Sequence, residues 1–152
     1  MFDGAIDWMK NYGVPTLAGS RLVLTDFWEE KWPPWIVGIY QWLLANRYRP
    51  ILAHPERMPA GKSVATGLDT LVEMGVWRQG NLRCFTGEDG YQPDQNIRKF
   101  TRPGQYHFMV LDMHGLECLE GRLDGMQLMA QEFGSDLLDE LTIDAPRRLI
   151  LG

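Results

Sequence analysis

Residues 49–57 read Arg49-Pro50-Ile51-Leu52-Ala53-His54-Pro55-Glu56-Arg57. The apolar run in this stretch is typical of a buried β-strand, and it ends directly on a histidine. Pro55 fixes the turn that follows His54. Arg57 then offers a planar guanidinium group that suits a phosphate or a carboxylate. The alternative interpretation is an ordinary strand-to-loop turn with a surface ion pair between Glu56 and Arg57, which would contribute little to stability.

Two other strand-like runs also end on a side chain of a metal-binding type. One run leads into Asp26, and another leads into Asp112, with His114 two residues further on. Because the carboxyl ends of parallel strands lie on one face of a sheet, we expect these side chains to form one cluster with His54. Imidazole nitrogens and carboxylate oxygens suit manganese, zinc or iron. The alternatives are a chance Asp-x-His pattern and an aspartate that only caps a helix.

The composition is that of an ordinary globular protein. The chain has 152 residues, of which 45% are hydrophobic and 23% are charged, and these values predict one domain over residues 1–152 with a real core. The net charge is −5 and no run of Lys or Arg occurs, which argues against a general nucleic-acid binder.

No segment of the sequence indicates export or membrane insertion. The start, Met1-Phe2-Asp3-Gly4, lacks the basic and apolar regions of a signal peptide. The longest apolar stretch, residues 35–45, is interrupted and far shorter than the ~20 residues of a membrane span. The two cysteines, Cys84 and Cys118, make no disulfide framework. We therefore expect a cytoplasmic protein without membrane insertion.

Strand and helix patterns alternate along the chain. Strands are predicted at about 21–27, 49–54, 76–82 and 106–112. Helices are predicted at 3–12 with Asp3 as the N-cap, at 36–44, around 68–72 with an end at Gly75, at 94–101, at 123–133 and from about Pro146. This order predicts the α/β class, with parallel strands joined by right-handed crossovers. The chain is shorter than the ~200 residues of a complete eightfold barrel, so an open sheet or part of a barrel is expected.

Residues 28–35 read Trp-Glu-Glu-Lys-Trp-Pro-Pro-Trp. Three tryptophans around a Pro-Pro pair can form a recognition surface or a lid over a site. The commoner role of such a loop is to pack across helix ends, and this is the interpretation that we favour.

The segment from Tyr48 to Arg57 resembles the Y-x-P-I-L-A-H-P-E-R signature of the PHP-type bacterial tyrosine-protein phosphatases of capsule and exopolysaccharide synthesis, the CpsB/CapC kind. The resemblance extends over about residues 16–151. Residues 17–27 resemble the family's Y-V-L-I-E-F strand, and Gln79 and Asn81 resemble its Q-x-N element. Residues 111–114 resemble S-D-x-H, and Arg122 resembles the arginine that follows this motif. Residues 141–151 resemble the N-P-x-x-x-L ending.

The resemblance implies a partial PHP-type distorted (β/α) barrel. It also implies a metal-dependent protein-tyrosine phosphatase that hydrolyses phosphotyrosine by means of metal-activated water. His54, Asp112 and His114 would be metal ligands, and Asp26 would be a further ligand in place of the family's Glu. The implied metal is Mn²⁺, or another divalent ion such as Zn²⁺ or Fe²⁺.

By the same resemblance, Arg57 and Arg122 would be the catalytic arginines that bind the phosphate. The implied partner is a phosphotyrosine protein, namely a bacterial tyrosine kinase of polysaccharide export. This chemistry requires no nucleophilic cysteine. Consistently, neither cysteine begins the Cys-x5-Arg loop of the thiol-based phosphatases, since position 90 is Gly and position 124 is Asp.

Parts of the family pattern have no counterpart in the chain. In the family, the side chains of a His-x-His strand, a downstream Asp and a further His also contribute ligands. The match begins about 100 residues into the family's domain. Leu111 replaces a Ser, and Ala145 replaces an Asn. The strands that are missing would leave a sheet edge, which we expect an oligomer or a partner chain to cover. The alternatives for function are a catalytically impaired remnant or regulatory module with the same fold, and a different PHP phosphoesterase such as a histidinol-phosphatase-like enzyme.

Overall fold

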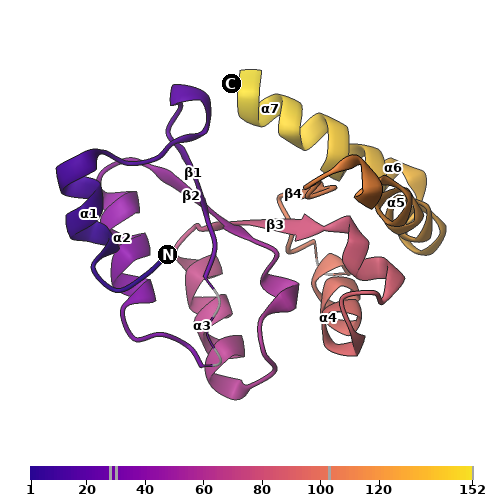
Figure 1. Ribbon diagram of the computed structural model, residues 1–152, viewed down its shortest axis with the longest axis horizontal. Coiled ribbons are helices and arrows are strands. Elements are labelled where there is room, and N and C mark those ends of the chain that lie inside the picture. Colours follow the sequence, from indigo (N-terminus) through magenta and orange to yellow (C-terminus); the bar gives the residue numbers. More distant parts are fainter. Residues whose placement is uncertain (28, 30, 103, 152) are drawn as a thin grey trace. The chain divides into compact units, whose positions relative to one another are not determined.

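The computed structural model describes residues 1–151 except 28, 30 and 103, with the backbone alone at 117, 150 and 151. The chain forms two compact units (Figure 1). The N-terminal unit comprises Met1–Ala53 and Met58–Trp77, and the C-terminal unit comprises His54–Arg57 and Arg78–Gly152. The single domain over residues 1–152 stays a prediction.

The N-terminal unit is built around a parallel β-α-β crossover. Strand β1 (Leu22–Thr25) pairs in parallel with β2 (Arg49–Ala53), and Leu22 lies opposite Arg49. Helix α2 (Ile36–Ala45) connects them. The residues that α2 buries are Ile36, Ile39, Tyr40 and Leu43. Their spacing of three and four residues places them on one face of the helix, and the helix predicted at 36–44 is confirmed.

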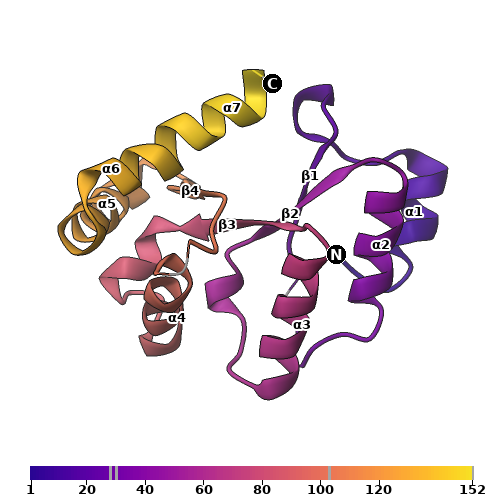
Figure 2. The same cartoon turned by 180° about the vertical axis from the view of Figure 1, so that it is seen from behind.

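Helix α1 (Ala5–Tyr12) lies beside α2, and α3 (Lys62–Glu73) completes the N-terminal unit (Figure 2). The prediction that Asp3 caps α1 is wrong, because Gly4 is the N-cap and no side chain donates or accepts there. The backbone at Gly4 has φ of 89°, a left-handed conformation that glycine adopts without strain and aspartate does not.

The tryptophan-rich loop packs inside the N-terminal unit where it is described. The Trp32 ring covers α3 at Gly67, where an added Cβ atom would come within 2.2 Å of the ring. Phe27 makes edge contacts with the rings of both Trp32 and Trp35, at centroid distances of 5.8 and 6.4 Å. These contacts support packing for Trp32 and Trp35, while Trp28 lies outside the described residues.

The C-terminal unit contains the other parallel pair. Strand β3 (Trp77–Asn81) pairs with β4 (Phe108–Val110), and Gln79 lies opposite Phe108. Between them lie the short helix η3 (Leu82–Thr86) and α4 (Tyr91–Thr101). The buried core of this unit is Leu82, Cys84, Phe85, Ile97, Tyr106, Met109, Met129 and Leu141. The four strands alternate with helices, and the predicted α/β class is therefore confirmed.

Helices complete the C-terminal unit after β4. The short helix η4 (Leu116–Cys118) leads into α5 (Leu119–Phe133), and α6 (Ser135–Asp139), the π-helical turn η5 (Glu140–Asp144) and α7 (Ala145–Leu151) follow. Patterning predicted α5 and a last helix near Pro146, but it did not predict α6 or η5. None of the helices in the described part of the chain has the length and apolarity that crossing a membrane requires.

Helix α5 packs closely on η3 at a glycine. A Cβ atom at Gly125 would lie 2.2 Å from the backbone oxygen of Leu82, which cannot move like a side chain. At Gly121, one turn earlier, an added Cβ would meet only the flexible carboxylate of Glu88, at 3.2 Å. The sequence of α5 therefore contains one glycine that packing requires and one that it does not.

We predict that Gly125→Ala destabilises the protein by about 1–3 kcal/mol, because overpacking outweighs the helix propensity that alanine gains. Urea denaturation measures the change. Gly121→Ala is the matched control, since it gives the same gain in propensity on the same helix, and its stability should equal or exceed that of the unmodified chain. Equal effects of the two substitutions would contradict the packing of α5 on η3.

Candidate active site

Two of the predicted site residues have a left-handed backbone at the end of a strand. The φ angles are 33° at His54 and 51° at Asp112, and such values are uncommon outside glycine. His54 still donates its backbone N–H to the oxygen of Gln79, at 2.8 Å, before the chain turns into the short helix η2 (Pro55–Arg57). Backbone strain of this kind gathers at functional sites, where the surrounding structure maintains it.

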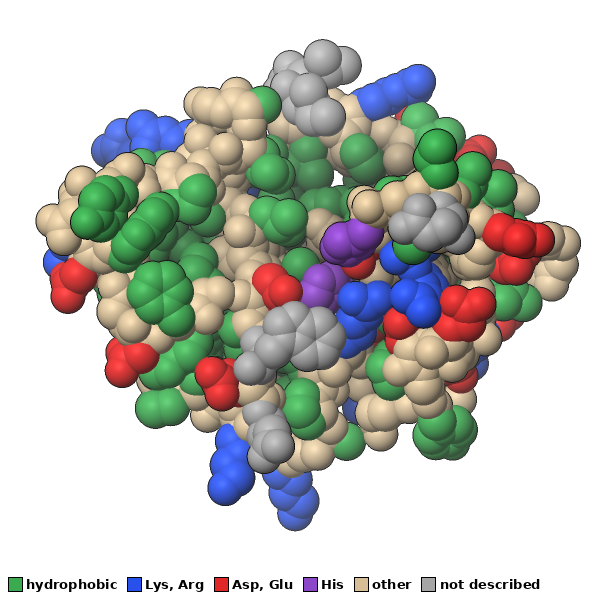
Figure 3. Space-filling model, viewed as in Figure 1, with side chains coloured by type: hydrophobic (Ala, Val, Ile, Leu, Met, Phe, Trp, Pro, Cys, Tyr) green, Lys and Arg blue, Asp and Glu red, His purple; other side chains and the backbone are tan. Residues whose placement is uncertain are grey.

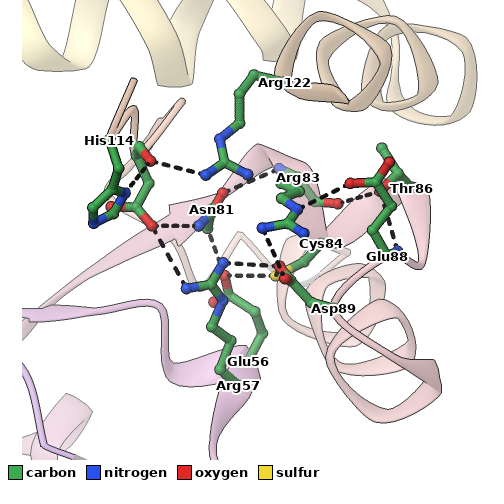
Figure 4. A network of polar contacts seen from close by, with 11 residues as sticks. Glu56, Arg57, Asn81, Arg83, Cys84, Thr86, Glu88, Asp89, His114 and Arg122 are labelled. Atoms are coloured by element: carbon green, nitrogen blue, oxygen red, sulfur yellow. Dashed lines mark hydrogen bonds and ion pairs between the residues drawn. The ribbon is translucent and has the colours of Figure 1, made fainter. Parts of the chain in front are cut away.

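Asp112 contacts four residues of a polar cluster in the C-terminal unit, and Figure 4 labels these partners, Arg57, Asn81, His114 and Arg122. Its Oδ2 atom accepts a hydrogen bond from Asn81 Nδ2 at 2.8 Å and lies 3.5 Å from Arg57 Nη1. Its backbone oxygen accepts from Arg122 Nη2 at 3.0 Å and lies 3.0 Å from His114 Nδ1. The structure thus brings four of the predicted site residues together, from η2, the end of β4 and α5.

The predicted metal ligands are placed as follows. The contact of His114 Nδ1 with a backbone oxygen leaves Nε2 to face another group, which is the usual arrangement of a metal-ligating histidine. Histidine side chains are exposed beside basic side chains in the space-filling view (Figure 3). Asp26 belongs to the N-terminal unit, where the amino group of Met1 donates to its backbone oxygen.

Across the described residues, no group of three or more His, Cys, Asp and Glu side chains is arranged to hold a metal ion. The donor types do fit one, since imidazole nitrogen and carboxylate oxygen are ligands of manganese, zinc and iron. The assignment of His54, Asp112, His114 and Asp26 as ligands therefore stays a prediction.

Arg57 is held by a carboxylate that the sequence did not point to. Its Nη2 atom donates to Asp89 Oδ2 at 2.8 Å, and only 16% and 14% of the two side chains are exposed. Burial by itself lowers the pKa of Arg57, but the hydrogen bond to Asp89 and the electrostatic interactions with Cys84 and Asp89 together outweigh it, and the pKa is raised. Burial by itself raises the pKa of Asp89, but the hydrogen bonds from Arg57 and Cys84 and the charges of Arg57 and Arg83 together outweigh it, and the pKa is lowered. Both groups are therefore charged at neutral pH.

Glu56 is buried and does not pair with Arg57. Its Oε1 accepts from the backbone N–H of Asn81 and its Oε2 from the hydroxyl of Tyr106, both at 2.7 Å. Its backbone oxygen accepts from Asn96 Nδ2 at 3.0 Å. The surface ion pair between Glu56 and Arg57 that the sequence allowed is thus wrong, because Glu56 points inward and anchors η2 to β3, to α4 and to Tyr106.

Cys84 is not a nucleophile in this environment. Its Sγ atom lies 3.3 Å from Asp89 Oδ2 and 3.6 Å from Glu56 Oε1. Burial, followed by the charges of these two carboxylates, raises the pKa of the thiol. Because the thiolate is the reactive form of cysteine, the thiol of Cys84 is inert at neutral pH.

Sequence reasoning missed two of the residues that organise the site. Asp89 lies in the loop between η3 and α4, 32 positions after Arg57, and no pattern connects them. Asn81 was noted only as part of a matched motif, but it joins Asp112 to Glu56 through its side chain and its backbone. Its position at the end of β3, next to the ends of other strands, was the signal that could have identified it.

The fold is that of a group of known phosphatases. A solved structure, described as that of YwqE from Bacillus subtilis and CpsB from Streptococcus pneumoniae, unique metal-dependent tyrosine phosphatases, matches 99% of the chain with a TM-score of 0.82 at 22% identity. The chain covers 61% of that structure. A likeness at this level of identity establishes the fold of the chain.

The family follows from the sequence. The family model of CpsB/CapC, capsular polysaccharide synthesis, matches residues 2–151, and the chain therefore belongs to this family. It is 25% identical over 154 residues to the tyrosine-protein phosphatase CpsB of Streptococcus pneumoniae, with 97% of the chain and 63% of that protein aligned. It is also 25% identical over 131 residues to the tyrosine-protein phosphatase YwqE of Bacillus subtilis, with 86% of the chain and 52% of that protein aligned. The resemblance to the CpsB/CapC kind of phosphatases is thereby confirmed, and the chain spans less than two thirds of the length of these relatives.

The buried carboxyl of Glu56 gives a testable pH dependence. Burial raises its pKa from 4.5 to about 7, although hydrogen bonds from Tyr106 and Asn81 act in the opposite direction. Between these two values the folded protein keeps a proton that the unfolded chain has released. The free energy of unfolding therefore falls as the pH rises from about 4.5 to 7, by on the order of 3 kcal/mol.

We predict that Glu56→Gln, which keeps the shape and does not titrate, removes this fall. Urea denaturation of the metal-free chain between pH 4.5 and 8 should show the variant gaining stability relative to the unmodified protein as the pH rises. Parallel stability curves over this range would show that Glu56 has an ordinary pKa.

Proposed function

We propose that the chain is a metal-dependent protein-tyrosine phosphatase of the CpsB/CapC family, acting on phosphotyrosine in proteins of capsule or exopolysaccharide synthesis. One observation carries the proposal. Two arginines and a histidine converge on Asp112 at a strained strand end, in a chain whose named relatives are tyrosine phosphatases. Phosphoryl transfer requires positive charge that offsets the phosphate oxygens, and here that charge lies beside carboxylate and imidazole groups, which are metal-ligand types.

The arginines would bind the phosphate. Arg57 has Nη1 directed toward Asp112 at 3.5 Å, a distance too long for a strong hydrogen bond, so this donor is available to a phosphate oxygen. Arg122 is 97% buried with Nη2 on the backbone oxygen of Asp112, which fixes its position. The guanidinium groups would offset the charge of the phosphoryl oxygens through charge-assisted hydrogen bonds.

His54, Asp112 and His114, with Asp26 as a further ligand, would hold the metal, for which we propose Mn²⁺ ahead of Zn²⁺ or Fe²⁺. When bound, such an ion supplies Lewis-acid chemistry that activates water and offsets phosphoryl charge. The chain's own residues orient the site. Asn81 holds Oδ2 of Asp112, and the Asp112 backbone oxygen sets the direction of the His114 ring. The thiol of Cys84 takes no part, since it stays protonated.

The substrate that we propose is a phosphorylated tyrosine kinase of polysaccharide export, as the family's role in capsular polysaccharide synthesis suggests. We place the reaction in the cytoplasm. Both cysteines are free thiols, which suits a reducing compartment.

A regulatory module with the same fold and no turnover is the second candidate. It is favoured by the lack of a three-ligand group among the described residues. Metal content and activity distinguish it from the phosphatase.

The three histidines provide a direct test. We predict that the purified chain binds Mn²⁺ in stoichiometric amount and hydrolyses a phosphotyrosine peptide only when the metal is present. His54→Ala and His114→Ala should lose metal, measured by elemental analysis, and should lower kcat/KM by about 100-fold or more. His107→Ala is the matched control, because that exposed ring contacts the backbone N–H of Arg78, away from the cluster, and both metal and turnover should persist.

Each outcome assigns the chain to one candidate. Stoichiometric metal with turnover, both lost in the two variants, supports the phosphatase. Metal without turnover supports the regulatory module. A chain that binds no metal contradicts the proposed ligands.

A further inference from the structure

Asp89 lies between two arginines, and it is the one carboxylate that contacts both of them in the described cluster. Arg57 Nη2 donates to its Oδ2 at 2.8 Å, and Arg83 Nη1 lies 3.5 Å from its Oδ1 (Figure 4). The thiol of Cys84 also donates to Oδ2, at 3.3 Å. Asp89 thus has three partners, and the close-up shows the side chains of Arg57 and Arg83 both directed toward its carboxylate.

This arrangement leaves other donors of Arg57 directed elsewhere. Asp89 occupies Nη2, whereas Nη1 faces Asp112 at 3.5 Å. The Nε atom is buried and has no hydrogen-bond partner among the described residues, and the same holds for Nε of Arg122. Buried donors without a partner are uncommon in proteins and are satisfied where a ligand supplies an acceptor. Two guanidinium groups with such an unpaired Nε donor therefore lie beside Asp112, and this favours the binding of an anion with several oxygen atoms.

The carboxylate also fixes the direction of the guanidinium plane. A flexible arginine side chain has many rotamers, and a short, charge-assisted hydrogen bond at one Nη atom restricts them. With Nη2 held on Asp89, rotation that would turn Nη1 away from Asp112 breaks this bond. Because only 14% of the Asp89 side chain is exposed, solvent weakens the pair less than it weakens a surface ion pair.

We propose that Asp89 is a positioning residue for phosphate binding, which acts by orienting Arg57 toward Asp112. The inference rests on the proposed phosphatase function, because it assigns to Arg57 the role of binding the phosphoryl group. Asp89 does not touch the substrate in this scheme. It sets the orientation of the arginine before the phosphate arrives, which lowers the entropic cost of binding.

Asp89→Asn is the test, because asparagine keeps the size and one acceptor but removes the charge. The matched control is Glu88→Gln on the same loop, since Glu88 contacts Arg83 at 3.0 Å with 53% of its side chain exposed and does not contact Arg57. With Mn²⁺ present, we expect Asp89→Asn to lower kcat/KM for a phosphotyrosine peptide by about tenfold or more. It should also weaken the binding of inorganic phosphate, measured as a rise of at least about fivefold in its competitive inhibition constant. Glu88→Gln should change both by less than about twofold.

A double-mutant cycle separates orientation from a general loss of structure. If Asp89 acts through Arg57, Asp89→Asn should change kcat/KM by less than about threefold in an Arg57→Lys background. Melting temperature and manganese content are measured for every variant. An effect of Asp89→Asn that persists at full size in the Arg57→Lys background would overturn the inference.

The direction of the change in phosphate affinity is also decisive. Tighter binding of inorganic phosphate by Asp89→Asn would show that the carboxylate competes with phosphate, and unchanged kinetics would show that it does not orient Arg57. Either result overturns the inference.

A second measurement does not depend on turnover. Nuclear magnetic resonance records the Nη signals of the Arg57 guanidinium group, which are assigned by their absence in Arg57→Lys. If the unmodified chain neither hydrolyses the peptide nor binds phosphate, the proposed function fails, and the role of Asp89 is decided by this signal. Separate Nη resonances in the unmodified chain that merge in Asp89→Asn support the orienting role. Merged resonances in both proteins overturn it.

Discussion

Two protein groups donate to the buried carboxyl group of Glu56, the backbone N–H of Asn81 and the hydroxyl of Tyr106, and the sulfur of Cys84 lies 3.6 Å from its Oε1 atom. A buried carboxyl group is costly unless such partners satisfy it. Satisfied in this way, it ties the turn that carries His54 and Arg57 to β3 and to the core of the C-terminal unit. The positions of the neighbouring functional side chains, and the strained backbone at His54, depend on this anchor.

The sequence predicted the parts of the structure that local patterns determine. The four strands, the helix α2 and the parallel α/β class follow from apolar periodicity and from alternation of elements. The strands are shorter than predicted, since β2 ends at Ala53 and β4 at Val110. The backbone turns left-handed at His54 and Asp112, and propensities along the chain carry no signal for such a conformation. The turn η5 and helix α6 were missed for a similar reason, because they lack a clear stripe of buried residues.

The candidate site was predicted only in part. His54, Arg57, Asp112, His114 and Arg122 were named from strand ends and from a family motif, and the cluster around Asp112 contains the last four. The carboxylates were harder to predict, because their roles depend on tertiary contacts. Glu56 next to Arg57 suggested an ion pair, but it is Asp89, 32 positions away, that holds the arginine. Charge partners that meet only in the folded chain leave no periodic pattern in the sequence.

The environment of Cys84 also bears on the chemistry of oxidative stress. Peroxide oxidises cysteine through its thiolate, and thiol-based phosphatases lose activity when that sulfur becomes sulfenic acid. The sulfur of Cys84 is buried beside two carboxylates and keeps its proton. Peroxide therefore has no reactive sulfur at this position beside Arg57, and the polar cluster keeps its chemical composition under conditions that modify exposed, acidic thiols.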